Sequence, residues 1–293
     1  MSNVKISPST RKLAQEKGID IEALARDLGR STIGPEDLSR GGRTPATPAG
    51  DTSYWDVDHA QYGPVTEEPM SRFAQVAARN LAAAQALIPA VTHHDRADVS
   101  SIEALRKAWK PDAQARGVKL TALAFHVVAL ARCLREFPRF NASLSADGGT
   151  LVLKDYVHVG IAVDTPHGLM VPVIRDADRK GLWAIGAEIA DLASRAQARK
   201  VGPTEMGGAS MTITNLGGIG GTAFTPIVNP PEVAILGITR TETVTVWDGD
   251  SPRPVPMVPL DLSYDHRVIN GADAARFLAR YAAVVGDPRH MLV

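Results

Sequence analysis

Regular hydrophobic spacing occurs in two parts of the chain, separated by a stretch that has none. Near the N-terminus, apolar positions recur at helical intervals and predict three short helices that begin near Pro8, Asp20 and Pro35. Their apolar side chains are few, so the sequence predicts a small helical module over residues 1–38 that is marginally stable by itself. Residues 39–69 are rich in Gly and Pro and show no sustained period, which is typical of a flexible linker.

From residue 70 to residue 293, helical and strand-like patterns follow one another. Helical spacing predicts the helices 70–87, 120–137, 182–198 and 271–285. Short apolar or alternating runs predict the end of a strand at 97–99 and strands at 151–163 (as a pair), 210–214, 233–239 and 257–264. Strands interleaved with helices predict a mixed sheet with helices packed against it, in an α/β domain of about 225 residues.

The charge balance limits the kinds of partner. The chain has 32 basic and 32 acidic residues. It therefore lacks the positive surplus with which nucleic-acid and anionic-membrane binders neutralise phosphates, and we expect neither partner. The first twenty residues lack the continuous apolar core of a secretory signal, and no apolar run is long enough to cross a bilayer, so we expect a cytoplasmic protein.

Cysteine and histidine usage gives no sign of a metal centre. The single cysteine, Cys133, lies in an apolar helical run, so we interpret it as a core residue rather than a nucleophile. His93 and His94 lack a third ligand at a recognisable spacing, and we interpret them as surface residues. The glycine-rich run 217–221 is followed by Pro226 and not by a helix, which favours a close turn over a dinucleotide-binding loop.

His266 is the strongest candidate for chemistry. It follows the strand-like run 257–264 and precedes the start of a helix, although a lone histidine between charged neighbours is often a structural residue. Its surroundings, Ser-Tyr-Asp-His-Arg-Val-Ile-Asn-Gly-Ala, closely resemble the signature of the 2-oxo acid dehydrogenase acyltransferases and that of chloramphenicol acetyltransferase. Three further blocks that resemble the acyltransferases extend the match over almost all of residues 70–293: Phe140–Ser143, Gly168–Asp178 and Asn229–Gly237.

The resemblance implies a chloramphenicol acetyltransferase-like two-layer sandwich, preceded by the small helical module, and acyl transfer between a lipoyl thiol and coenzyme A without a metal. A thiol with a pKa of about 8.5 is mostly protonated at neutral pH, and the imidazole of His266 could act as its catalytic base. Thr214 aligns with the family's serine in Thr-Ile-Ser-x-Leu-Gly, whose hydroxyl stabilises the oxyanion, although a strand also favours a β-branched residue for packing alone. Asn270 replaces a common Asp, so we expect its neutral amide to hold the loop or the imidazole.

Residues 4–38 resemble the family's peripheral subunit-binding domain, which docks dehydrogenase or decarboxylase subunits. The family's glycine-rich loop is not kept in residues 26–33, and the charge of residues 1–38 is balanced. Arg11, Lys12 and Arg30 are the candidates for docking. No lipoyl domain is recognisable, so either the chain is truncated or the lipoyl group comes from outside it.

The resemblance further implies a homotrimer in which His266 faces Thr214 of a neighbouring chain, and the resemblance of residues 287–293 to the family's apolar ending allows a larger cage. Residues 222–229 resemble the pyruvate branch best, which favours acetyl transfer. Two alternatives stay open: a stand-alone acyltransferase that uses coenzyme A with another acceptor, and a non-catalytic scaffold.

Overall fold

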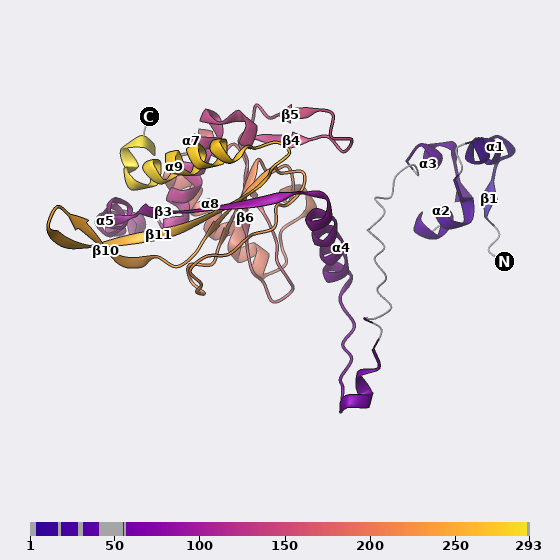
Figure 1. Ribbon diagram of the computed structural model, residues 1–293, viewed down its shortest axis with the longest axis horizontal. Coiled ribbons are helices and arrows are strands. Elements are labelled where there is room, and N and C mark those ends of the chain that lie inside the picture. Colours follow the sequence, from indigo (N-terminus) through magenta and orange to yellow (C-terminus); the bar gives the residue numbers. More distant parts are fainter. Residues whose placement is uncertain (1–3, 17–18, 29–31, 41–54, 56, 292–293) are drawn as a thin grey trace. The chain divides into compact units, whose positions relative to one another are not determined.

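The computed structural model describes residues 4–16, 19–28, 32–40, 55 and 57–291 (Figure 1). The chain divides into two compact units, Met1–Glu67 and Glu68–Val293. Among the helices that are described, none combines the length and apolar character needed to cross a membrane.

The first unit contains the three predicted short helices, α1 (Pro8–Glu16), α2 (Ile21–Leu28) and α3 (Pro35–Arg40). The Ser7 hydroxyl accepts a hydrogen bond from the N–H of Thr10 (3.1 Å), as expected at a helix start. A short parallel pairing between β1 (Lys5–Ile6) and β2 (Thr32–Ile33) was not predicted. The buried apolar core is as small as the sequence indicated: Ala14, Ala25, Ile33 and Leu38.

The second unit alternates helices and strands. Its helices are α4 (Arg72–Leu87), α5 (Ser100–Ala108), α6 (Lys110–Ala115), α7 (Ala122–Glu136), α8 (Leu182–Gln197) and α9 (Gly271–Gly286). Its strands are β3 (Ala90–Asp98), β4 (Ala142–Leu144), β5 (Leu151–Leu153), β6 (Val159–Ala162), β7 (Val173–Ile174), β8 (Met211–Asn215), β9 (Ala234–Ile238), β10 (Glu242–Asp248) and β11 (Ser251–Asp265).

Within the described residues of this unit, seven strands form one sheet in the order β10-β11-β9-β8-β6-β7, and β3 pairs with the other side of β11. Strands β6, β8 and β9 are mutually parallel, whereas β3, β7, β10 and β11 pair antiparallel to their neighbours. The predicted mixed sheet is therefore confirmed. The β10–β11 hairpin extends beyond the sheet, and α4 projects away from the other end of β3 (Figure 1).

The two faces of the sheet differ in character because side chains alternate along each strand. One face is apolar, with Leu260, Leu262 and Tyr264 of β11 and Met211 and Ile213 of β8 in the main core, which also contains residues of α5, α7, α8 and α9. The other face is polar yet largely buried. We call it the polar face and define it by Ser210, Thr212, Thr214, Asp261, Ser263 and Asp265.

One strand prediction was wrong, and one hairpin was not predicted. Residues 151–163 do not form a pair of strands: β5 pairs with β4, whereas β6 belongs to the main sheet. The hairpin of β10 with the first half of β11 was not predicted, because Pro252, Pro254 and Pro256 argue against a strand. These prolines occupy every second position of β11, so their backbone groups all face the same side. The Pro256 carbonyl accepts from the Val99 N–H, which shows that this side faces away from β10. The missing N–H groups therefore interrupt no hydrogen bond to β10.

Candidate active site

Thr214 lies on β8 in the middle of the sheet. It stands opposite Ala162 of β6 and Gly237 of β9, so small residues flank its side chain on both sides. Residue 237 must be small, because a Cβ there would lie 2.7 Å from the ring of Phe224. The Thr214 side chain is half-buried, and the Phe224 ring lies over the glycine next to it. The hydroxyl is therefore held on a rigid strand in a partly enclosed position.

His266 is the first residue after β11 and is exposed. Its backbone N–H donates to the Pro89 carbonyl (3.2 Å), and its ring centroid lies 5.8 Å from that of Tyr264. The turn that carries it is fixed by Asp265, whose backbone carbonyl accepts from the N–H groups of Val268 and Ile269, both at 3.0 Å. The sequence thus places an accessible imidazole on a well-anchored turn.

The charged neighbours of His266 bind each other. The buried Asp265 carboxylate accepts from the Arg267 guanidinium (Nη2 to Oδ2, 2.6 Å) and from the Arg267 backbone N–H (3.0 Å). The hydrogen bond to Asp265 raises the pKa of Arg267. Both charges therefore stabilise the turn and leave the imidazole free for another partner.

Asn270 is the N-cap residue of α9, and its backbone carbonyl accepts from the N–H of Ala274 (2.9 Å). Its side chain makes no capping hydrogen bond and is exposed. Within the described residues, the amide makes no hydrogen bond to His266. Its expected role in holding the imidazole stays a prediction.

A single chain does not bring Thr214 and His266 together. The register places Thr214 level with Gly237 and Asp261, whereas His266 follows Asp265, four residues beyond Asp261 on β11. At about 3.3 Å per residue, the two positions are separated by at least about 13 Å along the strands, and by two strand spacings across the sheet. Their joint action requires a hydroxyl or an imidazole from another copy of the chain.

A buried carboxylate lies in the same row of the sheet as Thr214. His94 Nδ1 lies 2.6 Å from Asp261 Oδ1, and Asp261 is 1% exposed. Asp261 Oδ2 also accepts the backbone N–H of Phe224 (3.3 Å), which anchors the segment that covers Gly237. The His94 side chain is itself 50% exposed, so the interpretation of His94 as a surface residue is confirmed, although one of its ring nitrogens contacts the buried Asp261. The alternation of Leu260, Asp261, Leu262 and Ser263 was the signal that could have revealed the polar face.

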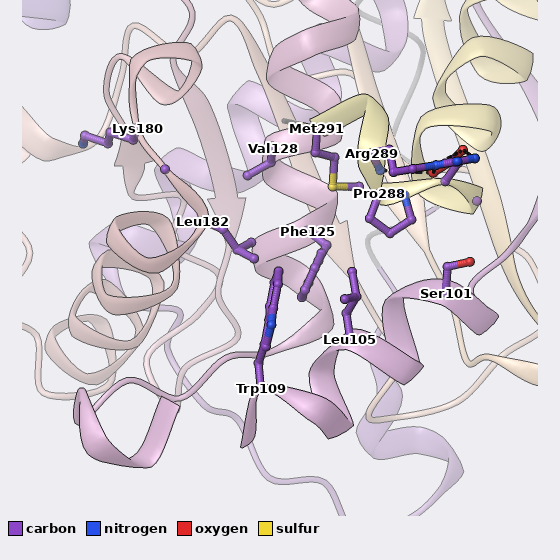
Figure 2. Close-up of a pocket in the computed structure, with 13 residues that line it drawn as sticks. Ser101, Leu105, Trp109, Phe125, Val128, Lys180, Leu182, Pro288, Arg289 and Met291 are labelled. Atoms are coloured by element: carbon purple, nitrogen blue, oxygen red, sulfur yellow. Dashed lines mark hydrogen bonds and ion pairs between the residues drawn. The ribbon is translucent and has the colours of Figure 1, made fainter. Parts of the chain in front are cut away.

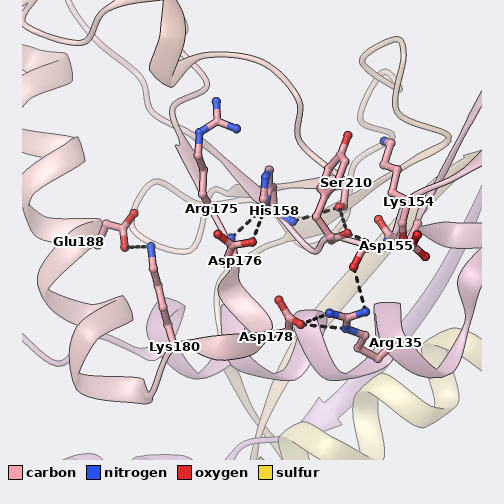
Figure 3. A network of polar contacts seen from close by, with 12 residues as sticks. Arg135, Lys154, Asp155, His158, Arg175, Asp176, Asp178, Lys180, Glu188 and Ser210 are labelled. Carbon is pink, nitrogen blue, oxygen red and sulfur yellow. Dashed lines mark hydrogen bonds and ion pairs between the residues drawn. The ribbon is translucent and has the colours of Figure 1, made fainter.

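The start of β8 is held by a second polar network (Figure 3). Ser210 Oγ accepts from the His158 backbone N–H (3.0 Å), while the Ser210 N–H donates to the His158 carbonyl (2.7 Å). His158 Nδ1 accepts from the Asp176 N–H (2.9 Å), so the ring proton of neutral His158 resides on Nε2. Both ring and backbone of His158 are thus occupied in positioning β8, which leaves little scope for a catalytic role.

Other reactive groups lie inside the core. Cys133 is buried, and burial raises the pKa of its thiol to about 12, in agreement with the predicted core position. Burial lowers the pKa of His126 to about 4, and its Nδ1 lies 2.7 Å from the hydroxyl of Tyr281. Neither group is accessible to a substrate.

A cavity of about 780 Å³ lies elsewhere in the unit (Figure 2). Its wall is formed by side chains of α5, α7 and α8, by the junction of α5 with α6, and by the segment that follows α9. It includes Trp109, Phe125, Leu182, Pro288 and Met291. None of the candidate site residues lines it. Its apolar wall suits an apolar side chain better than a polar reaction centre.

In the first unit, Arg11 and Lys12 lie side by side in the sequence of α1 and are exposed. Arg30, the third candidate for docking, lies outside the described residues.

The fold and the candidate site together define a class: an α/β domain with one mixed sheet, which offers a strand hydroxyl and a turn imidazole suited to acyl transfer. The sequence model described as 2-oxoacid dehydrogenases acyltransferase (catalytic domain) matches residues 62–293. The chain belongs to this family.

Two curated relatives illustrate the similarity. Both are named dihydrolipoyllysine-residue acetyltransferase component of pyruvate dehydrogenase complex, and each is 45% identical to this chain over its whole length, one from Pseudomonas aeruginosa and one from Azotobacter vinelandii. The chain spans about half the length of these relatives, 55% and 48% respectively.

Solved structures agree with the fold. Azotobacter vinelandii dihydrolipoamide acetyltransferase is 51% identical, with a TM-score of 0.80 over 81% of this chain and 98% of that one. A structure named as the cubic core of the pyruvate dehydrogenase multienzyme complex gives the same values. The catalytic core of a 2-oxoacid dehydrogenase complex from Thermoplasma acidophilum is 37% identical, with a TM-score of 0.70 over 76% of this chain and 99% of that one.

Proposed function

We propose that this chain transfers an acetyl group between the thiol of a dihydrolipoyl group, supplied from outside the described chain, and coenzyme A. The observation that carries the proposal is the accessible imidazole of His266 on a turn anchored by Asp265, in a family of acyltransferases. The names of the relatives from the pyruvate dehydrogenase complex support acetyl as the acyl group. We propose a cytoplasmic location, with which the balanced charge and the single cysteine are compatible.

The proposed reaction needs a base and an oxyanion donor. His266 accepts the proton of the attacking thiol as the sulfur bonds to the thioester carbonyl carbon, and the carbonyl π electrons move to the oxygen. The Thr214 hydroxyl donates a hydrogen bond to that oxyanion. When the intermediate collapses, the second sulfur leaves and takes the proton back from His266. No metal is needed for any of these steps.

The spacing of the residues supports these roles. The solved structure of the Azotobacter vinelandii enzyme is described as an investigation of a serine, a histidine and an asparagine and of their role in its catalytic mechanism. Those three residues are separated by 52 and 4 positions along that chain. Thr214, His266 and Asn270 have the same separations in this one. We therefore assign the oxyanion donor to Thr214 and a supporting amide to Asn270.

We further propose that each active site lies between two chains of a homotrimer, and that trimers assemble into a larger cage. The separation of Thr214 and His266 within one chain supports the first part, and the likeness to a cubic core supports the second. The apolar cavity beside Pro288 and Met291 is a suitable contact between trimers. Mass measurement in solution is expected to find a species well above trimer mass, and a single species at trimer mass would exclude the cage.

We also propose that residues 1–38 dock a dehydrogenase or decarboxylase subunit and that residues 39–69 tether this module to the catalytic domain 70–293. Replacing Arg11 and Lys12 together by Glu is expected to weaken binding of such a subunit by at least about tenfold at low salt, because charge complementarity drives docking. Titration calorimetry measures this, and Lys5→Glu, at another exposed position, is the control. Equal affinity of the double variant and the wild type would exclude these residues from docking.

The acyl group and the acceptor are tested together. Purified chain is mixed with free dihydrolipoamide and with acetyl-, succinyl- or isobutyryl-CoA, and release of coenzyme A is followed. We expect acetyl-CoA to be the best donor. If none of the three acyl groups reaches dihydrolipoamide, the proposed function fails, and an acyltransferase with another acceptor or a non-catalytic scaffold replaces it.

A further inference from the structure

A buried carboxylic acid lies beside the strand that carries Thr214. Glu232 is 5% exposed and stands just before β9. Its Oε1 accepts from the Thr212 hydroxyl (2.9 Å) and from the Asn229 side-chain amide (3.2 Å). Its Oε2 is buried and, among the described residues, has no hydrogen-bond partner. One side chain therefore connects β8 to the segment that leads into β9.

The hydrogen bond reaches β8 close to the candidate site. Thr212 precedes Thr214 by two residues, so both side chains point to the polar face. Thr212 stands opposite Gly160 of β6, where a Cβ would lie 2.5 Å from the Thr212 hydroxyl oxygen. A glycine at position 160 thus leaves room for the hydroxyl that Glu232 binds.

The same strand is held at its start by a partly buried ammonium group. Lys154 Nζ donates to the carbonyl of Ala209 (3.0 Å), the residue before Ser210. Burial lowers the pKa of Lys154, while the charge of Glu232 raises it. Lys154 therefore holds the start of β8, and Glu232 holds its middle.

Folding stability does not explain why a carboxylic acid is buried at position 232. Burial raises the pKa of Glu232 to about 7, against the effects of Thr212, Asn229 and Lys154. An incompletely satisfied acid in the interior costs folding free energy that a well-packed apolar residue would not. A buried titratable group with few partners, next to a candidate active site, points to a functional constraint.

We propose that Glu232 is a positioning residue for Thr214. By binding Thr212 and Asn229, it holds β8 against the start of β9, the strand whose Gly237 stands opposite Thr214, and so sets the direction of the Thr214 hydroxyl. Glu232 touches no substrate in this proposal, which rests on the proposed function of Thr214.

The test is a double-mutant cycle on acetyl transfer to dihydrolipoamide. Glu232→Leu and Thr212→Val are each expected to lower kcat at least about tenfold and to leave KM for acetyl-CoA within about twofold, because a misdirected donor weakens transition-state binding. Glu232→Gln keeps an oxygen that can accept both hydrogen bonds, so we expect it to retain kcat within about threefold. In the Thr214→Val background, Glu232→Leu should have no further effect, since there is no hydroxyl left to direct.

The controls separate positioning from general stability. Thr92→Val removes a hydroxyl that lies 2.7 Å from Ser263 Oγ on the polar face. Thr92 is on β3, which β11 and β9 separate from β8, so this variant should leave kcat unchanged. Equal losses from Glu232→Leu in the presence and absence of the Thr214 hydroxyl would overturn the inference, as would full activity of both Glu232→Leu and Thr212→Val. A wild-type chain without any acyl transfer would instead contradict the proposed function. If Glu232→Leu does not fold, Thr212→Val and Glu232→Gln complete the test.

Discussion

Replacing His266 by alanine is expected to lower the turnover of acetyl transfer to dihydrolipoamide by at least about 10³-fold. The substitution removes the base that accepts the thiol proton, and a thiol is a far weaker nucleophile than its thiolate. Steady-state release of coenzyme A from acetyl-CoA measures the loss. Because the side chain is exposed and the turn is held by Asp265, we expect the melting temperature to stay within a few degrees of the wild-type value.

The control for this variant is His59→Ala, which removes another exposed histidine far along the chain from the candidate site. It should keep full turnover. A His266→Ala protein that is folded and works within tenfold of the wild type would contradict the role of His266 as the base.

Replacing Thr214 by valine is expected to lower kcat by about 10²–10³-fold, with a much smaller change in KM. Valine has nearly the same shape as threonine, so the strand packing persists while the oxyanion loses a preorganised donor. Thr214→Ser retains the hydroxyl and should keep kcat within about tenfold. If valine is tolerated as well as serine, Thr214 is only a β-branched strand residue.

The two inactive variants together test whether a site is shared between chains. In trimers formed at random from equal amounts of His266→Ala and Thr214→Val chains, about one quarter of the sites combine an intact imidazole with an intact hydroxyl. We therefore expect about a quarter of the wild-type activity after the chains are unfolded and refolded together. Activity no higher than that of the separately refolded variants would contradict a site formed between subunits.

Short-range sequence patterns predicted the parts of the molecule that depend on local interactions. Helical spacing predicted α7, α8 and α9, because burial of one helix face against the sheet produces that spacing directly. The turn at His266 was predicted in the same way, since it separates an apolar strand from a helix start within a few residues. After β8, the glycine-rich run 217–221 leads to β9 and not to a helix, as Pro226 indicated.

Pairing between distant segments was less predictable. Residues 151–153 and 159–162 looked like a strand pair, but each found its partner elsewhere, because pairing is decided by the packing of whole layers. The hairpin of β10 with β11 was not predicted, because three prolines in one run argue against a central strand. They are tolerated in β11 because their backbone nitrogens face away from β10.

The sequence by itself determined the fold class, the order of the main elements and the identity of His266 and Thr214 as candidates, because these follow from local periodicity and short motifs. Only the tertiary structure decided that the two lie too far apart to meet within one chain, since strand register sets that distance. The tertiary structure also decided that Asp261 is buried on β11 in the same row as Thr214, and that Glu232 is buried beside β8. Burial and partners are properties of a packed face, and no spacing along the chain encodes them.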